Sequence, residues 1–416
     1  MKFKYILPVA LLLASWGANA QNELSLDNYR ELVLNYNQDI KKAQEQIIAT
    51  DAKRKSIRTG FLPAIDFQGD YFYNLREAEK GGRSPHIYQA GVTLSQNLWD
   101  GGYTWASNKS GKIQKEISIL AEDQTLNNII YQADLVYWTA AANKDMYQTM
   151  IQYHSIVKSL FDVISKRFED GLIARTDLLM VQTRLKEAEV ALTNAKKSYL
   201  IANQGLNILM GFEPNADNSA SESINTQIPI PEFVTVNEAL DNRPEFAIAE
   251  KQIELAEQNK NIAKSKTNPK FYVGAKAGYG NQNVFMYKTW QNGLFASVQI
   301  PLFHGGDRFY STKAAKANVV IQQLNLQQTA DQISLELSNA ITSVEESGEA
   351  IRIAMESLNI AKQSLDINTF SYNEGRLTIL DVLQSQLSWI QASSNLIQAN
   401  LAHKVAIADY KKVIGE

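Results

Sequence analysis

The chain has 416 residues, a formal net charge of -3 and no cysteine. This composition excludes disulfides, thiol catalysis and a lipid on a mature N-terminal cysteine, and lysines and arginines interspersed with acids argue against a nucleic-acid partner. Residues 1–20 contain Lys2, Lys4, an apolar stretch and Ala18-Asn19-Ala20. This pattern is typical of a secretory signal, so we expect export and a mature, unlipidated chain starting near Gln21.

Two later segments alternate apolar and polar residues with a period of two, which predicts β-hairpins at 61–100 and 269–304 with polar tips at 76–85 and 281–292. Strands of about ten residues with one apolar, aromatic-rich face are typical of membrane β-strands. The alternative is that these are β-hairpins of a soluble protein, with one face exposed to water. Four strands cannot close and an open edge is unstable in lipid, so we expect several chains to share the strands. Two chains would form an eight-stranded barrel with a filled interior, whereas three chains would form a barrel wide enough for a lumen.

Proline is absent from residues 86–213 and 302–416, where long helices can therefore form. In the second stretch the apolar residues follow a heptad alternation: Leu337, Ile341, Val344, Ile351, Ala354, Leu358, Ala361 and Leu365. A helix from Gly102 to Phe168 has about 66 residues and is roughly 100 Å long. After the signal, no run of 18 apolar residues predicts a transmembrane helix.

The chain repeats itself at an offset of 204 residues. The matching pairs are Gly101-Gly102 with Gly305-Gly306, Gly171 with Gly375, Asp177 with Asp381, Gln182 with Gln386, Ala188 with Ala392 and Gly211 with Gly415. Each copy is predicted as helix, hairpin, very long helix, glycine turn and return helix. We expect a first repeat at 21–211, a linker at 212–235 that wraps the helices, and a second repeat at 236–416. Thr235 and Glu238 predict a capping box, and Pro244 a break soon after it.

At this point the motifs resemble those of the TolC-type outer-membrane efflux proteins, over essentially the whole mature chain. The motifs that carry the resemblance are Gly60-Phe61-Leu62-Pro63, Leu98-Trp99-Asp100-Gly101-Gly102, Pro301-Leu302-Phe303-His304-Gly305-Gly306, Arg167 to Leu178 around Gly171, and Tyr372 to Leu383 around Gly375. Their order and duplication make the resemblance specific.

The resemblance implies a mainly α protein with membrane β-structure: a homotrimer with four strands per chain in a 12-stranded β-barrel in outer-membrane lipid, continued by a periplasmic α-helical barrel. It also implies the exit duct of a tripartite efflux or type I secretion system in a Gram-negative bacterium. The duct opens at its periplasmic tip when docked to a periplasmic adaptor and an inner-membrane RND or ABC-type pump. No cofactor or metal is implied.

The resemblance further implies site residues at the two glycine turns. A latch is implied at Thr176, Asp177, Tyr372 and Arg376, and a pore constriction at Asp381 and Gln384. The turns for adaptor docking are Gly171, Leu172, Gly375 and Leu377. Two positions depart from the family pattern: Leu377 stands where an arginine is usual, and Gln384 where a second acid is usual.

Each of these assignments has a simpler alternative. Asp177 and Asp381 also suit the starts of helices, where a carboxylate meets the positive end of the helix dipole. The glycines suit helix ends. An enzyme is disfavoured, because His86, His154, His304 and His403 have no metal-ligand spacing and the double glycines lack a nucleotide-binding pattern. A periplasmic coiled-coil adaptor or scaffold without a membrane barrel is the remaining alternative.

Overall fold

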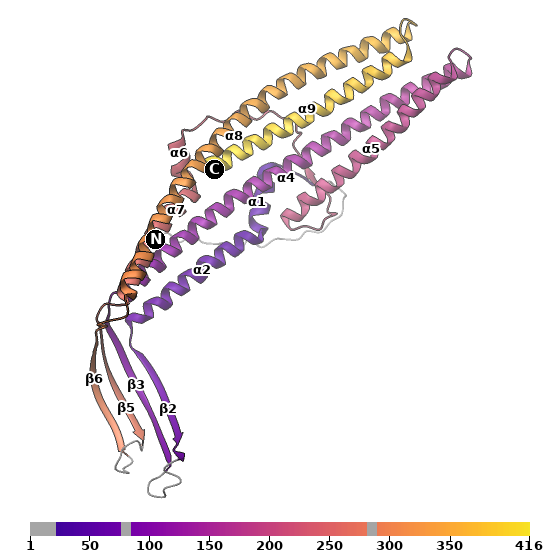
Figure 1. Ribbon diagram of the computed structural model, residues 1–416. Coiled ribbons are helices and arrows are strands. Elements are labelled where there is room, and N and C mark those ends of the chain that lie inside the picture. The colour runs from indigo at the N-terminus through magenta and orange to yellow at the C-terminus, as the bar shows by residue number, and fades with distance from the viewer. Residues whose placement is uncertain (1–21, 76–84, 281–288) are drawn as a thin grey trace. The chain divides into compact units, whose positions relative to one another are not determined.

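The computed structural model describes residues 22–75, 85–280 and 289–416 (Figure 1). The predicted signal and most of both hairpin tips lie outside these residues. The elements, in order, are β1 (Asn22–Leu24), α1 (Leu26–Tyr36), α2 (Gln38–Arg58), the short 3-10 helix η1 (Thr59–Phe61), β2 (Ala64–Tyr73), β3 (His86–Asp100), α4 (Tyr103–Glu169), α5 (Arg175–Met210), β4 (Asn218–Ala220), α6 (Val236–Asn242), α7 (Pro244–Ser265), β5 (Lys270–Gly280), β6 (Thr289–Gln299), α8 (Asp307–Asn373) and α9 (Ile379–Ile414).

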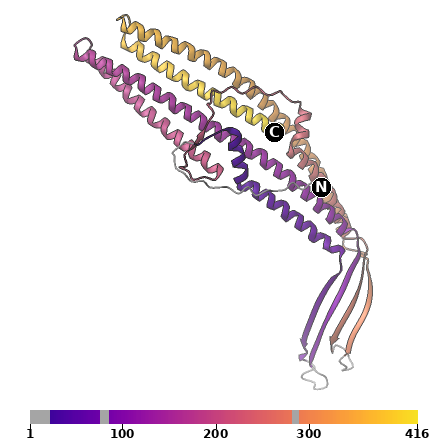
Figure 2. The same ribbon diagram turned by 180° about the vertical axis from the view of Figure 1, so that it is seen from behind.

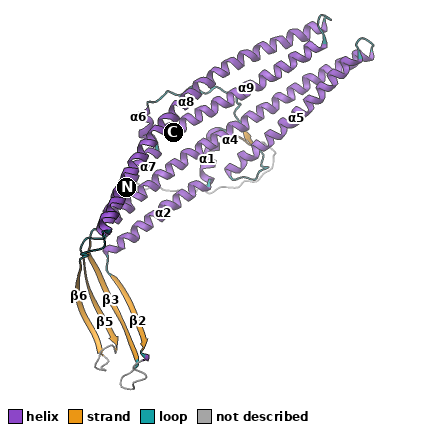
Figure 3. Cartoon of the chain, in the orientation of Figure 1, coloured by secondary structure: helices purple, strands orange, loops and turns teal. Residues whose placement is uncertain are grey.

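Element lengths repeat between the two halves of the chain. Helices α4 and α8 both have 67 residues, and α5 and α9 both have 36 (Figure 3). The predicted duplication is confirmed, as is the very long helix after each double glycine. Among the described residues, no helix is long and apolar enough to cross a membrane.

The chain divides into two compact units. The tip unit contains residues 22–37, 130–230 and 344–408. The sheet unit contains the described residues of 38–129, 231–343 and 409–416.

Four antiparallel strands form the sheet of the sheet unit, in the order β2-β3-β5-β6. Direct partners share a face: Phe67 lies opposite Val92, and Ala275 lies between Leu94 and Leu294. The registers therefore place most apolar residues of the four strands on one face, which confirms the predicted alternation, while Phe72, Ile87 and Phe295 lie on the other face. That face is solvent-exposed within one chain, with Phe67 74% and Leu294 90% accessible.

Within the tip unit, α5 runs back along α4 and α9 runs back along α8, as the two views of Figures 1 and 2 agree. The heptad residues predicted on α8 are all buried or partly buried, while most residues between them are exposed. The predicted stripe is thus the packing face of this helix.

The helix that precedes each hairpin is interrupted once. Pro244 begins α7 directly after α6, and Thr235 and Glu238 form the predicted capping box at the start of α6. In the first copy, α1 ends at Tyr36 because Asn37 leaves the helical conformation, with φ -52° and ψ 130°, and α2 follows. The sequence predicted only the break at Pro244, since no proline marks the other.

The part of the linker that lies in the tip unit is held by pairing and by buried polar contacts. Strand β4 pairs in parallel with β1. Lys404 on α9 donates a hydrogen bond from Nζ to the carbonyl oxygen of Thr226 at 2.6 Å, and its Nζ lies 3.8 Å from the centre of the Trp138 ring on α4. Both side chains are almost fully buried. The linker is therefore fixed to the helices at this point.

Candidate functional site

The two helical hairpins of the tip unit end in turns of the same geometry. Gly171 and Gly375 have φ values of 75° and 72°, in the left-handed region that favours glycine. The amide of Leu172 donates to the carbonyl of Arg167, and the amide of Arg376 donates to the carbonyl of Ser371, both at 2.9 Å. These hydrogen bonds, each between an amide and the carbonyl five residues earlier, end both long helices. Leu172, in the first turn, is 71% exposed.

The two aspartates behind these turns differ in their hydrogen bonds. Asp381 Oδ2 accepts one hydrogen bond from the Thr378 hydroxyl at 2.6 Å and another from the Thr378 amide at 3.0 Å. These bonds lower the pKa of Asp381 below its usual range. Ala174 stands where the second copy has Thr378, so it offers Asp177 no hydroxyl, and the start of α5 has no side-chain cap.

Tyr372 is buried near the end of α8, three residues before the turn glycine Gly375. It packs in an apolar cluster with Ile164 of α4 and Val181 of α5, and Arg167 Cζ lies 5.2 Å from the ring centre. Among the described residues, no hydrogen bond joins the Tyr372 hydroxyl to Thr176 or Asp177. Within one chain, this ring therefore connects the two hairpins by apolar packing and by a cation–π contact.

A groove of about 520 Å³ lies between the first turns of α5 and α9. Its apolar lining is mostly exposed, and its polar lining includes Thr176, Arg184, Glu187 and Gln384. Leu179 is 49% and Leu380 is 60% exposed. The structure thus brings together two residues that were predicted separately, Thr176 of the latch and Gln384 of the constriction.

The remaining predicted residues lie on the turn that closes the second hairpin. Arg376 is exposed, and Leu377 is 36% exposed. Sequence reasoning missed two contributors, Arg167 and Thr378. The pattern Thr378-x-x-Asp381 could have revealed the cap, because a threonine three residues before an acid is a helix-start pattern. No local sequence pattern predicts that Arg167 contacts the ring of Tyr372, which lies about two hundred residues later in the chain. In the part of the chain that the structure describes, no group of histidines and acids could hold a metal ion.

The duplicated order of elements in this chain is also found in known proteins. The profile of the outer membrane efflux protein family fits residues 30–212 and fits again at 235–416. The chain belongs to this family. Outer membrane protein TolC of Escherichia coli is 23% identical over 99% of this chain and 86% of its own length. Nodulation protein T of Rhizobium leguminosarum is 20% identical over 95% of this chain and 84% of its own length.

Solved structures show the same fold at low identity. The CmeC outer membrane channel of Campylobacter jejuni superposes with a TM-score of 0.80 at 17% identity, covering 99% of this chain and 94% of its own. The open MtrE channel of Neisseria gonorrhoeae gives 0.81 at 17% identity, covering 97% and 93%. As a member of this family of channels, the chain is an outer-membrane efflux protein of a Gram-negative bacterium and not an enzyme.

Proposed function

We propose that three copies of this chain form the exit duct of a tripartite efflux or type I secretion system. The observation that carries the proposal is the sheet, whose apolar face is exposed and whose outer strands, β2 and β6, each lack a neighbour on one side among the described residues. In lipid such edges have to be paired, and three chains supply twelve strands around a lumen. The apolar face then contacts the lipid of the outer membrane.

The helical hairpin ends are the proposed gate. Latch contacts of Thr176, Asp177, Tyr372 and Arg376 hold neighbouring hairpins together, and Asp381 and Gln384 surround the narrowest point. Three Asp381 carboxylates at one mouth repel each other and attract cations. This repulsion raises their apparent pKa as a coupled group, and it opposes the two Thr378 hydrogen bonds that lower the pKa in one chain.

Docking to a periplasmic adaptor is proposed at the turns around Gly171, Leu172, Gly375 and Leu377. Leu172 is exposed at the end of its hairpin, and the adjacent groove presents Leu179 and Leu380. An apolar helical partner fits such a surface, because a helix can place side chains three and four residues apart into one groove. The adaptor in turn would connect the duct to an RND or ABC-type pump of the inner membrane.

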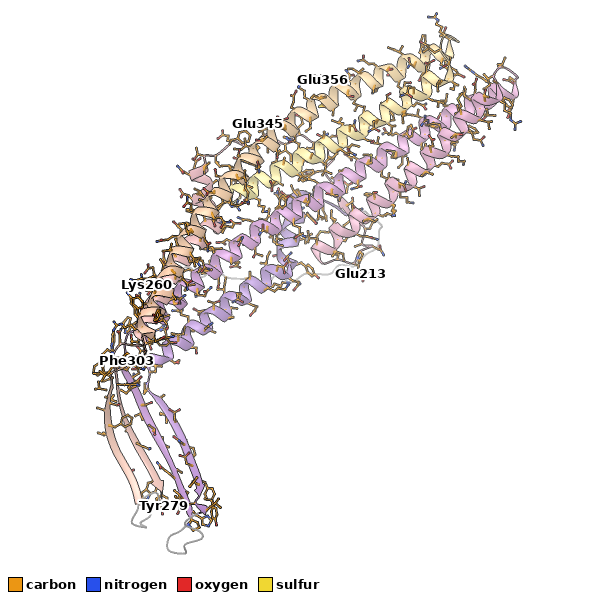
Figure 4. The ribbon with its side chains drawn as sticks, in the orientation of Figure 1. Glu213, Lys260, Tyr279, Phe303, Glu345 and Glu356 are labelled. Carbon is orange, nitrogen blue, oxygen red and sulfur yellow. The ribbon has the colours of Figure 1, made fainter. Side chains whose placement is uncertain are left out.

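The assembly is tested by mass measurement in detergent, where three chains are expected. A monomer that stays soluble without detergent would contradict the duct and favour a periplasmic scaffold. The constriction is tested in planar bilayers: Asp381→Asn should weaken cation selectivity. Glu213→Gln is the control, because Glu213 lies beyond the other end of α5 (Figure 4). Unchanged selectivity in Asp381→Asn would remove this residue from the pore.

The latch is tested by conductance. Tyr372→Phe and Asp177→Ala remove polar groups and keep the fold, so the combined variant should conduct more than the parent if those groups bind a neighbouring chain. Equal conductance would leave both residues with a role inside one chain only.

A further inference from the structure

The two copies differ where the sheet meets the helices. Strand β3 continues to Asp100, and its last residues pair with the start of β5: Trp99 opposite Phe271, and Asp100 opposite Lys270. Strand β6 ends at Gln299. The equivalent residues 300–304 form no strand, so in the second copy this extension lacks a pairing strand within the chain.

The double glycines show the same difference. A Cβ on Gly101 would lie 2.5 Å from the carbonyl oxygen of Ser265, and Asn268 Nδ2 donates a hydrogen bond to the Gly101 carbonyl at 2.9 Å. Gly305 has no atom within 4 Å of an added Cβ. The first junction is thus covered by the end of α7 and by the segment between α7 and β5, while the second is open.

The open junction is apolar. Leu302 is 92% and Phe303 86% exposed, and both line a groove of about 670 Å³ that continues along the first turns of α8. Figure 4 shows Phe303 at the end of the sheet next to the helices. The equivalent side chains of the first repeat, Leu98 and Trp99, are less exposed, at 62% and 44%. Because Leu302 and Phe303 together form a contiguous exposed apolar patch, this groove has the character of an interface whose partner lies outside the single chain.

We propose that a second copy of this chain fills the groove: residues 59–63 cover its Gly305 junction, and β2 pairs with β6 in a register that the internal duplication specifies. The inference rests on the proposed oligomeric duct. The internal duplication identifies the occupant. The segment that covers Gly101 belongs to the second repeat of the chain, and residues 59–63 are its equivalent in the first repeat. Leu62, 63% exposed in one chain, would enter the apolar groove.

The register follows from the two hairpins inside one chain. Ala64 lies opposite Ser95 in the first hairpin, and Lys270 lies opposite Gln299 in the second. Ser95 and Gln299 correspond at the repeat offset of 204, so Ala64 and Lys270 correspond at an offset of 206. Pro63 and Pro269, which precede these strands, agree with the second offset.

The pairs between β3 and β5 predict the contacts between chains. Adding 204 to each β3 residue gives its equivalent in β6, and subtracting 206 from each β5 residue gives its equivalent in β2 of the second chain. Thr93 opposite Lys276 becomes Ser297 opposite Asp70 of the second copy, and the neighbouring pair becomes Ala296 opposite Tyr71. Apolar residues then face apolar residues and polar face polar, which a shift by one residue would reverse. Pro301 falls at the equivalent of the β3 irregularity after Asn97, a position where a missing amide is tolerated.

Cysteine cross-linking tests this register, because the native chain has no thiol. Two double variants, Ser297→Cys with Asp70→Cys and Ala296→Cys with Tyr71→Cys, should give covalent trimers on mild oxidation. A β2–β6 register shifted by two residues would keep the apolar side chains on the same face, so it is the alternative to be tested. Ser297→Cys with Gln68→Cys, and Ser297→Cys with Phe72→Cys, represent the two shifted registers. The matched pairs should give about fivefold more product, since diagonal Cβ atoms lie too far apart for a disulfide.

The control is the equivalent pair inside one chain, Thr93→Cys with Lys276→Cys, which should lose its thiols without any gain in covalent mass. Mass measurement in detergent without oxidant is made on every variant. Trimers that cross-link only through a shifted pair, or through no pair, would overturn the register and leave the duct standing. Monomers throughout would instead overturn the proposed oligomer.

Discussion

The guanidinium carbon of Arg167 lies 5.2 Å from the centre of the Tyr372 ring, so the last turn of α4 meets the last turn of α8. A cation over a tyrosine ring contributes about 0.5–2 kcal/mol, depending on its exposure to water. This contact therefore helps to hold the two hairpins of one chain together at the proposed gate.

Replacing Arg167 with methionine keeps most of the aliphatic length and removes the charge. We expect the hairpin ends to separate more often, and single-channel conductance in planar bilayers to rise. Lys166→Met is the matched control, because Lys166 is the adjacent cation in the same last turn but is exposed. Equal conductance in the two variants would show that the Arg167 contact does not restrain the gate.

The two hydrogen bonds from Thr378 to Asp381 predict a pH dependence. Because hydrogen bonds from Thr378 lower the pKa of Asp381 in the folded chain, their contribution is present above the unfolded value of 3.8 and is lost as pH falls through the lower folded pKa. Thr378→Val removes the hydroxyl that donates to Asp381, so it should raise the pKa of this carboxyl. It should also speed amide exchange several-fold in the first turn of α9, because one of the two hydrogen bonds that hold this helix start is lost.

Ala174→Thr provides the converse experiment at the uncapped start of α5. It should slow exchange in that turn at neutral pH, with the effect disappearing in acid. Amide hydrogen exchange followed by mass spectrometry measures both variants. If Thr378→Val leaves exchange in α9 unchanged at neutral pH, the hydrogen bonds do not stabilise this helix start.

Lys404 predicts a change in stability at alkaline pH. Burial lowers its pKa from 10.5 to about 8. Between these values the unfolded chain binds more protons than the folded one, so Lys404 makes stability rise with pH. Lys404→Met should reduce the slope of melting temperature against pH in this range, whereas the exposed Lys197→Met should not. Parallel slopes in Lys404→Met and the parent would contradict the lowered pKa.

The two double glycines predict opposite defects. Gly101→Ala places a Cβ 2.5 Å from the Ser265 carbonyl oxygen at a φ of 76°, so the chain itself should be destabilised. Gly305→Ala, at a φ of 58° in open space, costs about 1–2 kcal/mol of backbone strain within one chain. If a second copy covers this junction, Gly305→Ala should instead weaken the trimer. Mass measurement in detergent and circular dichroism separate the two effects, and an undisturbed Gly305→Ala trimer would leave the junction uncovered.

Patterns within a few residues of one another determined most of the elements. The alternation around Phe67 predicted its strand, the spacing from Leu337 to Leu365 predicted the packing face of α8, and Thr235 with Glu238 predicted a helix start. Such patterns depend on side-chain periodicity and on hydrogen bonds three or four residues apart, which the sequence displays directly. The repeat at an offset of 204 predicted the two-fold internal architecture in the same way.

Tertiary structure alone decided which of the repeated positions have partners. Tyr372 packs under Arg167, because α4 and α8 bring together residues about two hundred positions apart. Gly101 and Gly305 are equivalent in sequence and differ in cover, since the segment that closes one junction lies in the same chain and the segment that would close the other does not. A local pattern fixes what each residue can do, and the path of the chain in space fixes which neighbour it meets.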